Sequence, residues 1–555
     1  MSRRRVSKSI QDGVKITLLR IKNMQVPLTE EADLSVLVAK RLGLPPQAVL
    51  GVVIVRKAID ARRYRGAPIQ FTYMLDVEIA PAHEKKLRGK LKKDKNLEII
   101  VPQPLTERNF PAPGQGELPP AVVGFGPAGM FAALTLARAG YRPLVLERGA
   151  DVDTRTKDIE SFWQGGGLKL QSNVQFGEGG AGTFSDGKLT TRINDPLMGE
   201  IIEAFIRAGA PEEIRYLHKP HIGTDLLRGI VRNIRQEIIS LGGQVRFGAQ
   251  VTDLELAPGG ELAALIVGSE ERIPCQAAFF GIGHSARDTY RMLLSRGLKM
   301  EAKPFAMGVR IEHPQEFIDR AQYGEDAGHP RLPVADYALT YKDPVTGRGA
   351  YSFCMCPGGL VVAATSEKEG VVTNGMSNFA RDSGIANSAL LVQVGPEDFG
   401  REVLSGMALQ EKLEHLAFDL GGRDYKAPVQ TVGDFLSGSV GAQSFLTSPT
   451  YRPGVKTADL HDCLPEFITK TLAGALPYFD RKIPGFADPG AVMTGIESRS
   501  SAPCRIVRDR ENMMAEGTPG LYPMGEGAGY AGGIMSAAVD GMKAALAFLT
   551  ASVAY

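Results

Sequence analysis

The chain is poor in cysteine and has no long uncharged hydrophobic run. Its 555 residues include 5 cysteines, none of them in a CxxC pair, which argues against a disulfide framework and a zinc knuckle. No stretch approaches the roughly 18 uncharged apolar residues that a membrane helix requires. The basic N-terminus is not followed by an apolar segment and a cleavage site, so it does not resemble a secretory signal. We therefore expect a soluble, cytoplasmic protein that does not bind a membrane.

The small net charge hides an uneven distribution. Residues 1–100 hold 21 Lys and Arg against 10 Asp and Glu, whereas the remaining 455 residues hold 43 against 52. A basic module joined to an acidic body is a reason to consider nucleic acid or another polyanion as a partner. The basic runs are at 2–5, 62–65 and 84–95. They could contact RNA phosphates or form a solvated basic face, and only Tyr64, Phe71 and Tyr73 are at hand to stack bases.

The first 105 residues predict a small α+β module. Strands are expected at 14–22, 50–57 and 69–80, and helices at 29–43 and 82–93. This βαββα order is typical of a sandwich with helices on one face of a sheet. A stretch rich in Pro and Gly follows at 106–120 and is a natural linker.

A dinucleotide-binding pattern follows the linker. A short apolar strand leads into Gly124, Gly126 and Gly129, an Ala/Leu-rich helix comes next, and a second strand ends at Glu147. In such a βαβ unit the glycines permit the tight turn, the approach of backbone to a pyrophosphate, and close packing of helix against strand. The helix N-terminus offers free N–H groups to the phosphates. Glu147 suits ribose hydroxyls and disfavours a 2′-phosphate, so the pattern predicts NAD or FAD rather than NADP.

Three further glycine-rich segments favour FAD, because a plain NAD domain does not need them. The segment 173–192 predicts a flexible loop able to wrap ribityl and phosphate groups. The segment 277–288 is an apolar strand that ends in a glycine turn, and 520–545 is a strand, a glycine turn and an amphipathic helix. Candidate FAD contacts in the loop are Gly179, Gly180, Gly182, Thr183, Ser185 and Lys188.

These segments resemble the flavoproteins with two dinucleotide-binding domains that are related to glutathione reductase. More closely, the chain resembles a bacterial family of largely uncharacterised FAD-dependent dehydrogenases. The shared strings are HIGTD (221–225), GHSARDT (283–289), FCMCPGG (353–359), VVTNGMS (371–377), ESRSSAPCRI (497–506) and GEGAGYAGGI (525–534). The resemblance extends over the whole chain. It implies an α/β fold: a Rossmann-like FAD-binding domain with an inserted α+β substrate domain and the small N-terminal α+β module.

The resemblance also implies which residues bind an extended FAD. Gly525 and Glu526 are similar to the Gly-Asp of related flavoproteins, whose acid binds a ribityl hydroxyl, although the glutamate is one methylene longer. Gly533 and Ile534 begin the helix whose N-terminus would face the isoalloxazine and favour negative charge there. The other implied contacts are Gly124, Gly126, Pro127, Ala128 and Gly129 for the pyrophosphate, Glu147 and Arg148 for the ribose, Val251 for adenine, and Gly281 and Gly283 on the adenosine side.

The expected domains follow from these segments. They are the module at 1–105, the linker at 106–120, the first part of the FAD-binding domain at 121–290, the inserted domain at 291–490 and the C-terminal FAD-binding part at 491–555. No second strand-GxGxxG-helix-acid unit is found, so a dedicated NAD(P)H domain is not visible.

The expected function is that of an FAD-dependent oxidoreductase. It would take hydride or electrons from an unidentified small-molecule substrate held by the inserted domain. Reduction of the flavin by a transiently bound NAD(P)H is left open. One alternative is an RNA-binding or tRNA-modifying flavoprotein that docks RNA through the basic module. Another is a protein in which FAD is only structural. No acid–base pair stands out, so the catalytic residues are not assigned.

The cysteines allow two interpretations. Cys354 and Cys356 could place a thiol over the flavin and relay electrons, but free cysteine is more often a small buried hydrophobe. No flanking cation is seen in the sequence that would lower their pKa. Cys504 is better placed for a lowered pKa, because it stands beside Arg505, or it simply packs below a turn.

The histidines are weighed in the same way. His284 could hydrogen-bond the flavin or a substrate anion. Alternatively, His284 and Ser285 could cap the next helix, because Asp288 follows Ser285 by three positions, as in a capping box. His218 and His221 form an HxxH pair without a third ligand at metal spacing. We therefore predict no metal.

Overall fold

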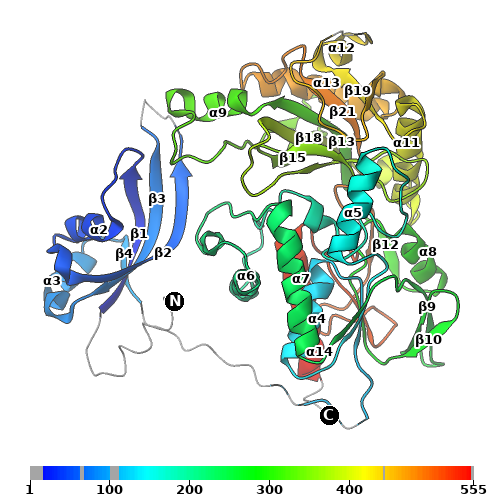
Figure 1. Ribbon diagram of the computed structural model, residues 1–555, viewed down its shortest axis with the longest axis horizontal. Helices are drawn as coiled ribbons and strands as arrows, with labels where there is room; N and C mark the ends of the chain where they lie inside the picture. The colour runs from blue at the N-terminus through cyan, green and yellow to red at the C-terminus, as the bar shows by residue number, and fades with distance from the viewer. Residues whose placement is uncertain are drawn as a thin grey trace. The chain divides into compact units, whose positions relative to one another are not determined.

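The computed structural model (Figure 1) describes residues 17–62, 68–100, 110, 112–114, 116–441 and 444–551. The basic run at 2–5, most of the run at 62–65 and parts of the linker at 106–120 lie outside the described residues. The chain forms two compact units. The smaller contains the described residues up to 100 together with 212–220 and 328–333, and the larger contains the rest.

The smaller unit is a four-stranded antiparallel sheet with two helices. The chain order is β1 (Thr17–Pro27), α2 (Leu34–Leu42), β2 (Val49–Asp60), β3 (Gln70–Ile79), α3 (Glu84–Leu91) and β4 (Leu97–Ile99). The strand order β2-β3-β1-β4 makes this a ferredoxin-like βαββαβ unit. The expected βαββα series was therefore incomplete, because three residues are too few to show an alternation of apolar and polar side chains.

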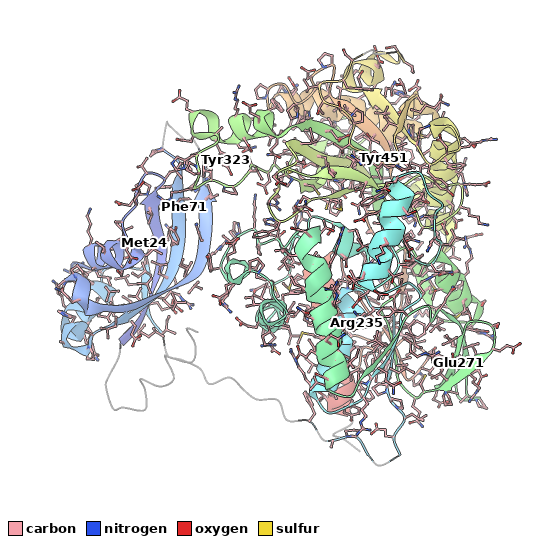
Figure 2. All side chains as sticks on the ribbon, viewed as in Figure 1. Met24, Phe71, Arg235, Glu271, Tyr323 and Tyr451 are labelled. Carbon is pink, nitrogen blue, oxygen red and sulfur yellow. The ribbon has the colours of Figure 1, made fainter. Side chains whose placement is uncertain are left out.

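The core of this unit lies on one face of its sheet. Alternate residues of β3 are buried, and Phe71 and Tyr73 are only 1% and 5% exposed. Met24 of β1 lies opposite Tyr73 and is also buried; Figure 2 labels Met24 and Phe71 on this sheet. On the opposite face Arg20 pairs with Asp76 at 2.7 Å. Two of the three aromatic rings considered for base stacking thus belong to the core, and the third, Tyr64, lies outside the described residues.

The larger unit is built around a five-stranded parallel sheet. Its order is β23-β11-β5-β6-β7. The strands are β5 (Ala121–Val123), β6 (Leu144–Leu146), β7 (Gln244–Arg246), β11 (Ala278–Phe280) and β23 (Leu521–Pro523). Helix α4 (Pro127–Arg138) packs against α7 (Thr224–Ser240) and α14 (Ile534–Ala551), as Figure 1 shows. The Rossmann-like fold that the sequence predicts is confirmed.

Helix α14 is a core helix of this unit. It is the one helix among the described residues that is long and apolar enough to cross a membrane, with a mean hydropathy of 1.4. It crosses α4 so closely that a Cβ on Gly541 would lie 2.0 Å from the carbonyl oxygen of Ala128. Its two charged residues are paired, Asp540 with Arg508 at 2.7 Å and Lys543 with Asp195 at 2.6 Å. These contacts account for its apolar composition by packing within the protein.

A second, seven-stranded sheet is formed by residues between β11 and β23. Its order is β14-β15-β18-β13-β21-β19-β20. The strands are β13 (Phe305–Pro314), β14 (Thr340–Lys342), β15 (Gly349–Cys356), β18 (Ile385–Val394), β19 (Ala427–Thr431), β20 (Val455–Thr457) and β21 (Val492–Glu497). The two-stranded pair of β12 (Met300–Ala302) and β22 (Cys504–Ile506) joins the two ends of this insertion.

The remaining elements surround the two sheets. The helices are α5 (Val152–Trp163), α6 (Leu197–Arg207), α8 (Arg287–Ser295), α9 (Gln315–Tyr323), α10 (Pro396–Phe399), α11 (Ser405–Gly421), α12 (Val432–Ser437) and α13 (Glu466–Asp480). The strands are β8 (Val251–Leu256), β9 (Leu262–Val267) and β10 (Glu271–Pro274), which form one small sheet, and β16 (Leu360–Ala363) and β17 (Thr373–Met376), which form a hairpin.

Candidate functional site

Three glycine turns and one glutamate meet at the carboxyl ends of neighbouring parallel strands. Strands β5, β11 and β23 lead into Gly124, Gly281 and Gly525, and β6 leads into Glu147. A Cβ on Gly124 would lie 2.5 Å from the carbonyl oxygen of Gly281, and a Cβ on Gly525 would lie 2.7 Å from Ala128 Cβ. Ligands of open α/β sheets bind at this edge. The fold thus gathers predicted site residues from three distant parts of the chain.

The turn after β5 has the free space and free donors that a pyrophosphate needs. A Cβ on Gly126 would meet only Gly180, at 3.6 Å from its Cα, whereas a Cβ on Gly129 would lie 1.9 Å from the carbonyl oxygen of Gly124. Gly126 is the N-cap of α4, and no side chain caps the helix. The first N–H groups and the positive end of the helix dipole therefore suit a bound anion. The observed geometry fits FAD at this turn.

The glycine-rich loop packs against this turn and the start of α14. A Cβ on Gly182 would lie 2.9 Å from Ile534 Cγ1 and 3.8 Å from Pro127 Cγ. An apolar cavity lies behind the loop. It is lined by Pro127, Met130, Phe131, Gly179, Gly182, Thr183, Phe205, Leu227, Val231 and Ile534. The candidate residues of the loop, of α4 and of α14 thus share one neighbourhood.

Arg155 holds the shape of this loop, although no sequence pattern singles it out. Arg155 is fully buried in α5, and its guanidinium donates to the carbonyl oxygens of Asn173 at 2.8 Å, Val174 at 2.8 Å and Glu178 at 2.7 Å. The Glu178 carboxylate lies 3.1 Å from Nε of Arg235 on α7, a residue labelled in Figure 2. A lone arginine in a helix carries no sequence signal for such a role.

Arg155→Lys is expected to loosen the loop. Lysine has three donors and lacks the planar fork of arginine, so at least one buried carbonyl loses its partner. We expect the free energy of unfolding to fall by about 1–3 kcal/mol and FAD to be lost more readily on gel filtration. Arg232→Lys, in the exposed pair with Asp153, is the control and should change neither measurement. An Arg155→Lys protein as stable as the wild type would contradict this role.

Glu147 is held by backbone rather than left free at the strand end. It is 4% exposed, and its carboxylate accepts the N–H groups of Phe125 at 2.8 Å, Gly149 at 2.8 Å and Gly177 at 3.0 Å. A carboxylate has about four acceptor positions, so one remains for a ribose hydroxyl. Glu147 thus ties the first glycine turn to the glycine-rich loop, and its contact with the ribose stays a prediction.

The other predicted adenosine contacts are placed as follows. Arg148 donates to both carboxylate oxygens of Asp288, at 2.9 and 2.8 Å, and its guanidinium lies 4.0 Å from the ring centre of Phe176. Val251 begins β8 and is buried in the hydrophobic core. Gly283 has a φ of 72° and open space beside its Cα. Their contacts with FAD stay predictions.

The polar side chains of the glycine-rich loop mostly stabilise the loop itself. The hydroxyl of Ser185 donates to the carbonyl oxygen of Gly182 at 2.7 Å, and Thr183 is buried. Lys188 lies 3.8 Å from Asp186, which also accepts from Arg381 of the inserted domain at 3.0 Å. Among the predicted FAD contacts of this loop, Lys188 is therefore the residue that carries a charge.

At the other end of the site, Glu526 lies against the start of α14. Its carboxylate accepts the backbone N–H of Gly533. Burial raises the pKa of Glu526 to about 7, and the positive charge of Lys303 acts in the opposite direction. The predicted acid is thus close to changing charge at neutral pH, next to the helix N-terminus that the resemblance assigns to the flavin.

Two expectations about the pKa values of the cysteines were wrong: that no cation acts on Cys354, and that Arg505 lowers the pKa of Cys504. Lys188 and Arg310 both act on Cys354, so cations do flank that thiol, although they come from distant parts of the chain. Cys504 is buried, and burial raises its pKa to about 12. Its neighbour Arg505 pairs with Glu301 at 2.9 Å instead of favouring a thiolate.

The capping box expected at Ser285 was also wrong. Helix α8 has Ala286 as its N-cap with no side-chain cap, and Asp288 binds Arg148. His284 lies 2.9 Å from the Ser285 hydroxyl, and burial together with nearby arginines lowers its pKa to about 3. His284 is therefore neutral at ordinary pH.

The HxxH histidines have other contacts. His221 stacks on Phe379 with ring centres 5.3 Å apart, and its Nε2 lies 3.0 Å from the carbonyl oxygen of Phe379. Arg56 lies 2.7 Å from Nδ1 of His218. Within the described ranges, no three His, Cys, Asp or Glu side chains gather in a way that could hold a metal ion.

A layer of buried polar side chains lies on the seven-stranded sheet of the insertion. Arg310 donates to both carboxylate oxygens of Glu497, at 2.5 and 2.9 Å, and to Asn387 at 2.9 Å. Glu312, two positions along the same strand, is fully buried; one of its carboxylate oxygens accepts from Thr450 and the other has no partner. Burial raises the pKa of Glu312 to about 7.

The raised pKa of Glu312 predicts a pH-dependent stability. Because the folded protein holds this proton above the ordinary value of 4.5, its contribution to stability is lost as the pH rises from about 5 to 8. At about 1.4 kcal/mol per pKa unit, the loss is about 3 kcal/mol. Glu312→Gln cannot titrate, so its urea unfolding should lose that much less stability between pH 5 and 8 than the wild type. Equal pH dependences would contradict the assignment.

A buried ion network joins α8 to the inserted domain. Glu414 of α11 is 2% exposed and accepts from Arg287 at 2.8 Å and from Arg499 at 2.7 Å. Glu367 pairs with the same two arginines. The two guanidinium groups hold the pKa of Glu414 well below its usual range, against the effect of burial. The network therefore anchors the insertion beside the turn that follows β11.

Comparison with known proteins finds two matching family descriptions and a relative that spans nearly the whole chain. The family described as "FAD-dependent protein, C-terminal domain-like" matches residues 304–500, and a domain of unknown function matches residues 18–78. An uncharacterised protein of Clostridium beijerinckii is 48% identical over 533 residues, which are 95% of this chain and 98% of that protein.

Solved structures share parts of the fold. Halogenase PltM is 10% identical over 79% of this chain and 70% of its own, with a TM-score of 0.37. A geranylgeranyl bacteriochlorophyll reductase-like protein from Thermoplasma acidophilum is 14% identical over 80% of each chain, with a TM-score of 0.35. These scores are too low to bear on function. The identity with the clostridial protein over nearly the whole length, together with the family match, shows that the chain belongs to this family of FAD-dependent proteins and that FAD is its cofactor.

Proposed function

We propose that the protein is a cytoplasmic FAD-dependent dehydrogenase that oxidises a small organic substrate at the edge of its inserted domain. FAD, when bound, accepts the hydride or electron pair. The fold class and the cofactor make an oxidoreductase the expected type of enzyme.

One observation carries the proposal: polar side chains of the inserted domain contact the glycine-rich loop, which is predicted to bind FAD. Arg381 binds Asp186 of the glycine-rich loop, as does the Ser377 hydroxyl. The charge of Lys188 acts on the Cys354 thiol, and the charge of Cys354 acts on the Glu526 carboxylate. An inserted domain that only covered the cofactor would have no need of charged groups at this edge, whereas a substrate that is to be oriented there needs them.

The residues at this edge have distinct roles in the proposal. The N-terminus of α14 stabilises negative charge that develops on a neighbouring group. Glu526, with a pKa of about 7, can hold or release a proton at its carboxylate near neutral pH. Lys188 supplies a positive charge for an anionic substrate group.

The test is the reduction of the bound flavin under anaerobic conditions. NADH or NADPH that bleaches the flavin absorbance would establish the nicotinamide as a transient reductant, and the search would turn to electron acceptors. A flavin that only organic substrates bleach would support the dehydrogenase as proposed. A flavin that no donor reduces would show that FAD is structural and would overturn the proposal.

No observation favours the RNA-binding alternative. Phe71 and Tyr73 belong to the core of the N-terminal unit, and Arg20 on the open face is paired with Asp76. Base stacking therefore lacks these two rings. Affinity for RNA that falls steeply with salt would reopen that alternative.

A further inference from the structure

Cys354 and Cys356 lie at an irregularity of β15. The strand pairs with β18 at Phe353 and again at Cys356, with a shift of register between them. In a regular strand, residues two apart are separated by about 7 Å, too far for their thiols to touch. Here the Cys356 thiol donates to the carbonyl oxygen of Cys354 at 3.2 Å, and the two thiols are close enough for each to shift the pKa of the other. The irregularity thus brings two thiols of one strand together.

The surroundings of the pair favour one thiolate and one thiol. Arg310 donates to the carbonyl oxygen of Cys354 at 3.0 Å, and Lys188 approaches from the glycine-rich loop. The neighbouring Cys356 thiol, with these two cations, lowers the pKa of Cys354 to about 5, while the pKa of Cys356 is raised. A thiolate beside a thiol is the reactive form of a dithiol.

The three other cysteines have no such environment. Cys275, Cys463 and Cys504 are buried, and burial raises the pKa of each to about 12. Cysteines of this kind pack as small apolar side chains. The difference separates Cys354 and Cys356 from the rest of the chain and supplies control positions.

The pair also faces the residues assigned to FAD. Arg310, which donates to the carbonyl oxygen of Cys354, also donates to Asn374 of β17 at 3.2 Å. Ser377, which directly follows β17, donates to Asp186 of the glycine-rich loop. Cys354 is half-buried, and its neighbour Phe353 is 42% exposed. The thiols therefore lie on the side of the inserted domain that contacts the glycine-rich loop.

We propose that Cys354 and Cys356 are a redox-active dithiol that exchanges an electron pair with FAD. In the oxidising direction one S–S bond forms between the two Sγ atoms, and the Cys356 S–H bond breaks. The two electrons and the proton released pass to FAD, which with one further proton from solvent becomes FADH2. The inference rests on the proposed function, because it requires a flavin that is itself reduced and oxidised.

The short spacing of the pair suits a reversible centre rather than a structural disulfide. A bond between residues two apart closes a small ring and departs from relaxed disulfide geometry, which makes it more reducible. Strained or exposed disulfides are the labile and catalytic ones. The cysteines are free in this structure, which corresponds to the reduced form.

The experiment is an anaerobic dithionite titration of the air-oxidised holoenzyme, with the thiols counted by iodoacetamide labelling and peptide mass spectrometry after denaturation. The wild type should take up four electrons per bound FAD, two for the flavin and two for the disulfide. Its Cys354 and Cys356 should be unlabelled before the titration and labelled after it. Cys356→Ser should take up two electrons, and the control Cys463→Ser should take up four.

The outcomes separate this inference from the proposed function. A wild type that takes up two electrons and whose two thiols are labelled in the air-oxidised protein would overturn the dithiol and leave the flavoenzyme intact. A flavin that accepts no electrons would instead overturn the proposed function. If Cys356→Ser does not retain FAD, the labelling of wild-type Cys354 and Cys356 before and after reduction decides the question alone.

Discussion

Replacing Glu414 by glutamine is expected to lower the free energy of unfolding by about 3–5 kcal/mol. The substitution removes a carboxylate that lies between Arg287 and Arg499, both nearly inaccessible to solvent. Breaking a buried ion pair is costly because the remaining charges keep their desolvation penalty, and here Glu367 alone would be left to pair with both arginines. The measurement is urea unfolding of the FAD-loaded protein near pH 7, followed by the fluorescence or circular dichroism of the chain.

The matched control is Glu411→Gln on the same helix. Glu411 pairs with Arg291, whose side chain is 50% exposed, and exposed pairs contribute about 0–1 kcal/mol. A pH series gives a second check. Because the pKa of Glu414 is lowered in the folded protein, its stabilisation is present above the ordinary value of 4.5 and is lost as the pH falls below it. Equal effects of the two substitutions would show that the network does not stabilise the fold.

Gly126→Ala is expected to yield a folded protein that has lost most of its FAD. The backbone of Gly126 is extended, with φ at -77°, so alanine meets no strain there. The nearest atom to the new Cβ is Gly180 Cα at 3.6 Å, an ordinary contact. The methyl group instead enters the space assigned to the pyrophosphate. Overpacking costs about 1–3 kcal/mol, which corresponds to roughly a 5- to 150-fold rise in the dissociation constant of FAD.

The control is Gly229→Ala in α7, where a Cβ would have no atom within 4 Å. This protein should keep its flavin and gain slightly in helix stability. The flavin content of the two variants is measured by absorbance after gel filtration, and their thermal unfolding is compared without added FAD. A Gly126→Ala protein with a full complement of flavin would remove the assignment of the pyrophosphate site.

The dinucleotide-binding turn could be predicted from sequence because its signal is local. Gly124, Gly126 and Gly129 stand in one turn, and Glu147 ends the next strand. The turns at Gly281 and Gly525 could be added because each follows a short apolar strand, and the carboxyl ends of parallel strands meet at one edge of a sheet. Strand β4 was missed because its three residues, Leu97–Ile99, form neither an apolar run nor a stretch long enough to show an alternation.

The charged contacts could not be predicted, because they join residues far apart in the chain. Glu414 meets Arg287 across 127 positions of sequence, and Lys188 reaches Cys354 from a different domain. The neighbours of Cys354 within the sequence gave the opposite expectation for its pKa. The same reason explains the wrong expectation for the pKa of Cys504, because the adjacent Arg505 pairs with Glu301. Sequence neighbours thus indicated backbone geometry well and side-chain electrostatics poorly.

The most direct test of the account is the cofactor content of the purified protein. The bound chromophore is released by denaturation, identified by mass spectrometry and quantified against the protein. The account predicts FAD, at one molecule per chain in the wild type. A protein that carries no flavin and binds none when FAD is added, or that selects a mononucleotide flavin instead, would contradict the assignment of the site at the carboxyl ends of β5, β6, β11 and β23.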